Sequence, residues 1–493
     1  MTSNTVRDPR RWWILVALCL AVLVLVVDNT VLNLAIPALM RDLGATPADV
    51  QWIIDGYILV FAGLLLTAGS LSDRYGRRKA LVFGLVIFGA ASGLAMLATE
   101  PWHLIGARVL MGVGGSFMMP STLSILITVF DEEERRTAIA AWSAVAGVGV
   151  IAGPTLGGFL LHNYYWGSVF LLNIPIAIVA IIAAFLLMPE SKGEPRGFDP
   201  VGVVLSITGL SSAVWVVIML PQEGFDPIMT AVAVLAIGGF VLWERRARHP
   251  LLPLELFRDR SFSGASFSIV LLSFGAGALM LALTQYLQFV LGYEPLRAGL
   301  ALVPYVVASF VFSGVGAALG KKVSNKTLIV VGLTVLAAAF GLLSTLDVAD
   351  GYGFLIACLV VMGVGGGLAG PAAYATLMGA VPPQHAGVGS ALNDTVQQVG
   401  AALSIAVLGS VLAAAYTAAM PADAPEAARE SVNAALDSGV AGLVQAGKES
   451  FLSAMSIGSW VGAGFTLLAA LVAMVVLPRK APVPEPVAEP VNM

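Results

Sequence analysis

Two stretches of the sequence are near copies of each other: LIGARVLMGVGGSFMMP at 104–120 and LIACLVVMGVGGGLAGP at 355–371. Aligning them places Gly112 on Gly363 within a shared MGVGG core. Each stretch is apolar and close to the roughly 20 residues that a helix needs to cross a bilayer. A membrane helix that recurs far along the chain indicates two parallel halves, an architecture in which the substrate site lies between the repeats.

A second pair of segments repeats with nearly the same spacing. SDRYGRRKALVFGL, which begins at Ser72, aligns with GKKVSNKTLIVVGL, which begins at Gly320, and this brings Gly84 onto Gly332. We therefore predict two six-helix halves with a helix pair inserted between them. The predicted parts are an N-terminal half at 1–190, the inserted pair of membrane helices with linkers at 191–250, a C-terminal half at 251–480 that includes an extracytoplasmic amphipathic helix at 419–450, and a disordered proline-rich tail at 481–493.

The composition of the chain fits this architecture. Its 493 residues are 58% hydrophobic and only 11% charged, whereas a globular domain carries about 25% charged residues. A net charge of −4 is too balanced for a nucleic-acid binder. Scanning for apolar windows gives about fourteen candidate spans, which begin near residues 12, 50, 80, 102, 137, 166, 200, 228, 263, 298, 327, 353, 388 and 451.

The loops between these spans predict the orientation. Basic residues gather in alternate loops, as Arg74, Arg77 and Arg78 do after the second span and Arg245 and Arg246 after the eighth. Lys and Arg are enriched in cytoplasmic loops, and an even number of spans returns the chain to its starting side. We therefore predict an all-α polytopic membrane protein of fourteen spans with both termini in the cytoplasm.

Three charged residues fall inside predicted spans: Asp28, Asp55 and Arg108. A charge near the centre of a membrane helix costs about 2.5–3.5 kcal/mol to insert, so by default it marks a pathway or a proton relay. Arg108 aligns with Leu359 and Asp55 with Val303, so the shared fold does not require these charges. We predict that the three groups couple transport to protons. The alternatives are a fixed helix–helix hydrogen bond for the acids and a static clamp for the arginine.

Polar and aromatic residues within the spans are candidates for a binding cavity. Gln285 and Gln288, placed in the middle of the ninth span, have the strongest case, because amides three residues apart share a face and need partners. For Trp52, a role as an interface anchor is an equally good interpretation. Asp394 lies near the cytoplasmic end of its span, and its alternative interpretation is a solvated acid. Acids with aromatic faces favour lipophilic cations. The predicted substrate-binding residues are Asn29, Asn33, Trp52, Tyr57, Gln285, Gln288, Asn393 and Gln397, with Trp142, Tyr286 and Tyr305 as further candidates.

Two glycine-rich motifs are candidates for conformational change. In the loop GSLSDRYGRRK, Gly69 and Gly76 allow a tight turn, and Asp73 can cap the next helix or pair with Arg77. This loop is a predicted latch, with a plain topology signal as the alternative. In the fifth span, glycines recur every four residues and place a smooth face against another helix, which a proline bends. The predicted gating residues are Gly69, Asp73, Arg74, Gly76, Arg77, Gly149, Gly153, Pro154 and Gly157.

These motifs resemble those of the major facilitator superfamily, and within it those of the fourteen-span drug:proton antiporters. GSLSDRYGRRK is similar to the superfamily's loop signature. The run that begins at Asp28 resembles the first-span motif of the fourteen-span branch, and Arg108 with Gly112 resembles the fourth-span motif. The fifth-span glycines with Pro154 resemble the antiporter motif, which is typical of exporters. The resemblance implies the superfamily fold, alternating access and multidrug or antibiotic resistance. The second half keeps only a degenerate loop signature, so no gating role carries over to Lys321.

We therefore predict a proton-coupled antiporter that exports lipophilic cationic drugs or antibiotics across a bacterial cytoplasmic membrane. The expected partners of this monomer are its substrates, protons and membrane lipids, without nucleic acid. An enzyme is not expected, because the sequence has no P-loop, nucleophile elbow or metal-ligand cluster; for the same reason, no cofactor or metal is expected. The alternatives are an uncoupled facilitator, a lipid or amphiphile exporter and, as the weakest, a membrane sensor.

Overall fold

The computed structural model of the chain describes residues 9–193, 199–247, 250–252, 254–293, 295–320, 322–347, 351–430 and 432–478. Across these ranges the regular structure is helical and contains no strand, as predicted. The side chains of Asn33 and Pro154 are not among those that the structure describes, and the predicted tail at 481–493 lies outside the described residues.

The N-terminal half is built mainly from long helices, and α2 shows how the sequence sets the start of one of them. At the start of α2, Thr46 Oγ1 accepts from the Asp49 amide at 3.2 Å, and the Asp49 carboxylate accepts from the Thr46 amide at 2.9 Å. This capping box, with Pro47 at the first helical position, starts the second span. The helices are α1 (Arg11–Asp42), α2 (Pro47–Tyr75), α3 (Arg77–Met96), α4 (Pro101–Val129), α5 (Glu132–Asn163), α6 (Ser168–Leu171) and α7 (Asn173–Leu187).

The inserted pair and the C-terminal half follow in the order that the apolar windows predict. The inserted helices are α8 (Pro200–Glu223) and α9 (Pro227–Glu244). The second half contains η1 (Leu254–Arg258), α10 (Arg260–Gln285), the π-helix η2 (Tyr286–Val290), α11 (Pro295–Ala301), α12 (Val303–Leu319), α13 (Asn325–Leu343), α14 (Tyr352–Gly379), η3 (Pro383–His385), α15 (Ala386–Ala419), α16 (Glu426–Glu430), α17 (Val432–Asp437) and α18 (Ala441–Val476).

The sequence repeat is also present in the helix packing. A Cβ added to Gly112 would lie 2.7 Å from the backbone oxygen of Tyr57, and one added to Gly363 would meet the backbone oxygen of Tyr305. The absence of a side chain therefore lets α4 approach α2 in the first half, just as α14 approaches α12 in the second. Tyr57 and Tyr305 occupy matching positions in the two halves, so the alignment predicted from sequence describes real structural equivalence.

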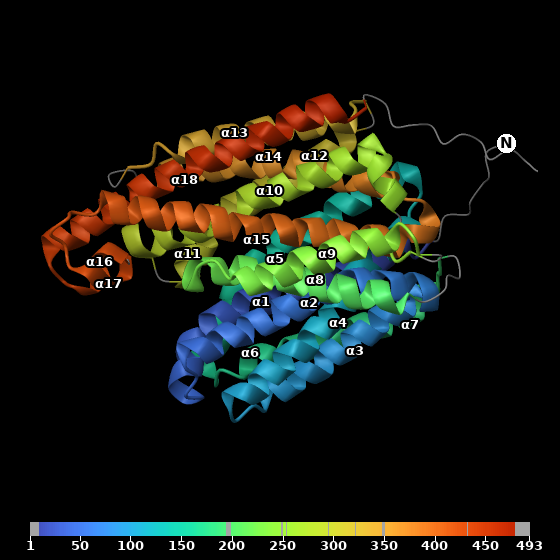
Figure 1. Ribbon diagram of the computed structural model, residues 1–493, viewed down its shortest axis with the longest axis horizontal. Coiled ribbons are helices and arrows are strands. Elements are labelled where there is room, and N and C mark those ends of the chain that lie inside the picture. The colour runs from blue at the N-terminus through green and yellow to red at the C-terminus, as the bar shows by residue number, and fades with distance from the viewer. Residues whose placement is uncertain are drawn as a thin grey trace, which may run out of the picture.

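The two halves lie side by side, with the inserted pair along their boundary (Figure 1). In this view α1–α4 and α7 lie on one side and α13, α14 and α18 on the other. The inserted α8 packs against both α2 and α15. The halves meet where α15 packs against α2 and α4 and where α5 packs against α11, α12 and α14. The short helices α16 and α17 lie at one end of the bundle (Figure 1).

The described residues contain 11 helices that are long and apolar enough to cross a membrane. Three further helices are also long: α5 with 32 residues, α10 with 26 and α15 with 34. Each of these three contains side chains that are not described, so 11 is a count of the described part and not of the whole chain. The count of fourteen spans stays a prediction.

The prediction of one amphipathic helix at 419–450 is wrong, because the segment is not a single helix. The segment forms two short helices, α16 and α17, and its last ten residues belong to α18. Gly439, with φ at +64°, follows α17 and ends it, because that left-handed backbone does not continue a right-handed helix. The short helices are held against α15, where Tyr416 Oη donates to the Ala428 backbone oxygen at 2.9 Å.

Candidate functional site

A buried ion pair joins α1 to α4 in the N-terminal half. Arg108 Nη1 donates to Asp28 Oδ2, and Arg108 Nη2 lies 3.4 Å from Asn29 Oδ1. Arg108 is 0% exposed and Asp28 only 4%. The structure thus brings together three of the residues predicted from sequence, in a place where charges are stable only when paired.

The same arginine also holds α2. Its Nε donates to the backbone oxygen of Ile53 at 3.1 Å, and its guanidinium carbon lies 4.3 Å from the centre of the Tyr57 ring. A guanidinium over an aromatic face is attracted by the ring's negative face. Arg108 therefore links three helices, which places the predicted site residue Tyr57 in the cluster and gives the charge several favourable partners.

Sequence reasoning missed Asn173, the first residue of α7. Its Nδ2 donates to Asp28 Oδ1 at 2.7 Å and also lies 3.1 Å from Ser92 Oγ on α3. Asn173 is 0% exposed. Asn173 could have been found from sequence, because it is a lone amide inside the apolar run of the sixth span. An amide within an apolar run was also the reason for selecting Gln285. With Asn173, both oxygens of Asp28 accept a hydrogen bond.

Asp55 lies apart from this cluster, although it is also buried. The residue is 6% exposed, and its Oδ2 has no hydrogen-bond partner among the described groups. Two residues later, the Tyr57 ring lies under the Arg108 guanidinium, and side chains two residues apart on a helix point in very different directions. Of the three predicted coupling residues, the structure thus pairs Asp28 with Arg108 and leaves Asp55 on another face of α2.

A second buried polar cluster lies on α15. Asn393 is 0% and Asp394 is 2% exposed, and Asn393 Nδ2 donates to Asp394 Oδ1 at 3.2 Å. Asp394 Oδ2, Asn393 Oδ1 and Ser390 Oγ have no hydrogen-bond partner within the described part of the chain. The solvated alternative for Asp394 is therefore wrong: this carboxyl is buried beside other unpaired polar atoms, an arrangement typical of binding or proton-transfer sites.

Residues of both halves meet beside the α15 cluster. Gln397 Oε1 accepts from Tyr374 Oη of α14 at 3.1 Å. The Tyr374 ring lies 6.4 Å, edge to face, from the ring of Trp142 on α5. Trp142 Nε1 in turn donates to Thr122 Oγ1 of α4 at 3.2 Å. The predicted candidates Trp142, Gln397 and Asn393 thus lie along one boundary between the halves.

Two predicted amides lie at a different depth than expected. Gln285 is the last residue of α10, and Gln288 belongs to the π-helix that follows, so neither is in the middle of a span. Both are half-buried. The π turn changes the angle between successive side chains, so the assumption that these two amides share a face no longer holds. Tyr286 between them is fully buried.

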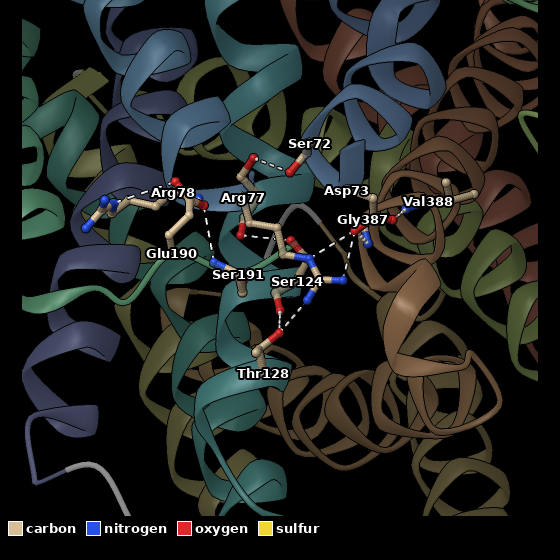
Figure 2. A network of polar contacts seen from close by, with 11 residues as sticks. Ser72, Asp73, Arg77, Arg78, Ser124, Thr128, Glu190, Ser191, Gly387 and Val388 are labelled. Carbon is tan, nitrogen blue, oxygen red and sulfur yellow. Dashed lines mark hydrogen bonds and ion pairs between the residues drawn. The ribbon is translucent and has the colours of Figure 1, made fainter. Parts of the chain in front are cut away.

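The predicted latch connects the two halves (Figure 2). Asp73 Oδ1 accepts from Arg77 Nε and from the Gly387 amide, both at 2.9 Å, and Asp73 Oδ2 accepts from the Val388 amide at 3.1 Å. Pairing with Arg77 was predicted. The helix that Asp73 caps is α15 of the opposite half, rather than the following α3, and its positive N-terminal end stabilises the carboxylate.

Neighbouring groups of the loop support this contact. A Cβ added to Gly69 would lie 2.6 Å from the Gly387 backbone oxygen, so only glycine lets α2 approach α15 this closely. Gly76 adopts φ +122°, which favours glycine, at the turn between α2 and α3. Glu190 accepts from the Arg78 amide at 3.1 Å beside this turn (Figure 2). Arg74 instead extends over Tyr75, 5.3 Å from its ring centre.

The fifth-span glycines pack against α1, as their four-residue spacing predicted. A Cβ added to Gly149 would lie 2.5 Å from Val26, and one added to Gly157 would lie 2.7 Å from Val31. At Gly153 it would meet the Thr30 hydroxyl. The glycine face therefore lets α5 pack closely on α1, on a side of that helix away from Asp28, which bonds to α4 and α7.

Gly153→Val is expected to lower the thermal unfolding midpoint of the purified protein by several degrees, because the added side chain overlaps Thr30 and overpacking costs about 1–3 kcal/mol. Gly158→Val is the matched control, since nothing lies within 4 Å of a Cβ added there. Equal midpoints for the two variants, measured by fluorescence in detergent, would contradict the packing argument.

A helical bundle of two repeated halves, with buried charges at its helix boundaries, is typical of membrane transporters. The chain belongs to the Major Facilitator Superfamily, whose family model matches residues 18–405. It is therefore a multi-pass membrane protein of a transporter family, not of an enzyme family.

Relatives and a solved structure agree with this assignment. The chain is 35% identical to the "Multidrug efflux pump LfrA" of Mycolicibacterium smegmatis, over 89% of this chain and 94% of that protein. It is 32% identical to the "Tetracenomycin C resistance and export protein" of Streptomyces glaucescens, over 94% and 91%. The crystal structure of the human organic anion transporter MFSD10 (TETRAN) matches with a TM-score of 0.65 at 14% identity, covering 94% of this chain and 100% of that one, which supports the fold alone.

Proposed function

We propose that the protein is a fourteen-span, proton-coupled antiporter that exports lipophilic, cationic drugs or antibiotics across the bacterial cytoplasmic membrane by alternating access. The names of the two relatives, a multidrug efflux pump and an antibiotic resistance and export protein, support drug export. In this proposal α5, α10 and α15 also cross the membrane, in addition to the 11 helices that are long and apolar enough to do so. Both termini are cytoplasmic, on the side where the basic loops gather. The protein acts as a monomer, with protons and membrane lipids as its other partners.

The unequal pairing of three buried acids is the observation that carries this proposal. Asp28 is bound by a guanidinium, whereas Asp55 and Asp394 each keep one oxygen without a hydrogen-bond partner in the described structure. An unpaired carboxylate is costly at membrane depth, and either a proton or a cationic substrate removes that cost. Two ligands that compete for one carboxyl cannot be bound together, and this competition is the basis of exchange.

Alternating access also needs a contact between the halves that can break. The bonds from Asp73 to the amides of Gly387 and Val388 fit that need, because hydrogen bonds at one end of the bundle can be exchanged for bonds to water when the helices separate. We propose that this contact is closed while the acids face the opposite side, and that it opens when the substrate is taken up.

The experiment that tests the function uses proteoliposomes with an imposed pH gradient and ethidium as the transported cation. Wild-type protein is expected to accumulate ethidium against its concentration gradient. Asp55→Asn is expected to lose at least about tenfold in gradient-driven rate, because an amide cannot exchange a proton and general acid–base groups typically contribute 10²–10⁴-fold. The rate is measured by ethidium fluorescence on added DNA inside the vesicles.

Asp42→Asn is the matched control, since Asp42 is a solvent-exposed acid that pairs only with its neighbour Arg41 among the described contacts. Its rate should equal that of wild type. Accumulation that ignores the pH gradient in wild type, with Asp55→Asn unchanged, would contradict proton coupling and favour the uncoupled facilitator. A lipid or amphiphile exporter predicts instead no accumulation of ethidium by any of the three proteins.

A further inference from the structure

The inserted helix α8 covers the face of α2 that carries Asp55. Gln51 Nε2 lies 3.4 Å from Met219 Sδ of α8, and Ser211 Oγ of α8 donates to the Leu59 backbone oxygen at 3.2 Å. Gln51 and Leu59 are each four residues from Asp55, so the three positions lie along one stripe of α2. The α8 helix therefore contacts that stripe on both sides of the carboxyl.

Two tryptophans form an aromatic wall beside this acid. The rings of Trp52 on α2 and Trp215 on α8 lie 5.3 Å apart, with an angle of 35° between their planes. Trp52 is three residues before Asp55, which puts both on neighbouring parts of one helix surface. Trp52 is 43% exposed, so the wall extends from the surface of the protein toward the buried carboxyl.

Neither α2 near Asp55 nor α8 supplies a cation that could balance its charge. Residues 47–63 of α2 contain no Lys or Arg, and neither does the whole of α8. Arg108 bonds to the nearby Ile53 backbone oxygen, but its charge is already paired with that of Asp28. Asp55 is 94% buried and its Oδ2 has no partner among the described groups. Packing alone would account for the two indoles in contact, but not for an acid with a free oxygen next to them.

We propose that α2 and the inserted α8 together form a subsite for an organic cation, in which Asp55 supplies the negative charge and Trp52 and Trp215 supply the aromatic surface. The thioether of Met219 adds a polarisable, adaptable contact at its edge. The inserted pair is then part of the substrate site and not a spacer between the halves. This inference rests on the proposed export function and deepens it, by naming residues that select cations.

Equilibrium binding of radiolabelled tetraphenylphosphonium to the full chain in lipid nanodiscs tests the subsite. Trp215→Leu is expected to raise the Kd about tenfold, because it removes one aromatic face from a desolvated cation. Trp215→Phe keeps an aromatic face and should stay within about threefold of wild type. Trp460→Leu is the matched control, since Trp460 is 62% exposed and belongs to α18, a helix that lies apart from α8 (Figure 1).

Trp52→Leu provides a second variant whose partly exposed side chain makes misfolding a lesser concern, and the same tenfold loss is expected. The subsite is overturned if wild type does not bind the cation, if both leucine variants bind it as well as wild type does, or if Trp215→Phe is as weak as Trp215→Leu. The export function is judged separately by the ethidium accumulation of wild type. Normal accumulation with unchanged tetraphenylphosphonium binding in the variants would refute the subsite and leave the export function standing.

Discussion

Asp28→Asn is expected to abolish gradient-driven accumulation and to lower the free energy of unfolding by about 3–5 kcal/mol, the usual cost of breaking a buried ion pair by removing one partner. The side chains of Arg108 and Asp28 are 0% and 2% exposed, so the guanidinium left behind cannot recover its interaction with water. Stability is measured by reversible denaturation in mixed micelles, and accumulation by the ethidium assay in proteoliposomes.

A double variant separates the two consequences. Asp28→Asn combined with Arg108→Leu removes both charges, and leucine is the residue that the second half carries at the equivalent position, Leu359, which is 0% exposed there. With both charges removed, no uncompensated charge stays buried, and such a charge is the source of the large cost of removing one partner alone. We therefore expect the double variant to regain most of the lost stability, which gives a large coupling energy in the double-mutant cycle.

Transport distinguishes a switch from a clamp. If the ion pair takes part in coupling, the double variant stays inactive although it is as stable as wild type. If Arg108 and Asp28 only hold the helices together, activity returns along with stability. Return of gradient-driven accumulation in the double variant would therefore exclude both residues from the coupling mechanism and leave Asp55 and Asp394 as its candidate acids.

The identity of the charged cluster was predictable from sequence, but its pairing was not. Arg108, Asp28 and Asp55 stand out because charges inside apolar runs are rare. Which acid meets the arginine depends on how each helix is rotated, and that rotation is set by close contacts such as Gly112 against the Tyr57 backbone. These contacts turn Tyr57 toward Arg108 and leave Asp55 on the stripe of α2 that contacts α8.

The repeat explains which parts of the fold were predictable. Helices with a partner in the other half, such as α4 and α14, were aligned correctly because both copies carry the same glycines. The inserted pair has no copy, so nothing in the sequence indicated that Trp215 would lie against Trp52. The same holds for Asp73: its loop was recognisable, but its contact with Gly387 joins residues 314 positions apart.

Asp73→Ala is expected to shift the protein toward the state in which α2 and α15 separate, by about 3 kcal/mol or about a hundredfold in the equilibrium constant. The carboxylate accepts from Arg77 and from two amides at the start of α15, and a hydrogen bond to a charged group contributes about 1.5–3 kcal/mol. Residue 73 is 6% exposed, so water replaces these bonds only after the helices have moved apart.

Distances between spin labels measure this shift. Lys79 and Gln384 belong to opposite halves near the contact, and nitroxides attached to cysteines at these positions, with Cys19 and Cys358 changed to Ala, report the separation of the halves. Asp73→Ala should move most of the distance distribution to longer values. Asp73→Asn is the matched variant, because its amide oxygen still accepts hydrogen bonds but carries no charge, and neutral bonds have roughly half the strength of charged ones.

An intermediate distribution for Asp73→Asn would assign the closure to the charge of Asp73 facing the positive end of α15, since the asparagine keeps the shape and an acceptor. If Asp73→Ala leaves the distances as they are in wild type, the apolar contacts of α2 with α15 close this end without help from the loop. The motif would then be a topology signal, and the breakable contact that alternating access requires would have to lie elsewhere along the boundary of the two halves.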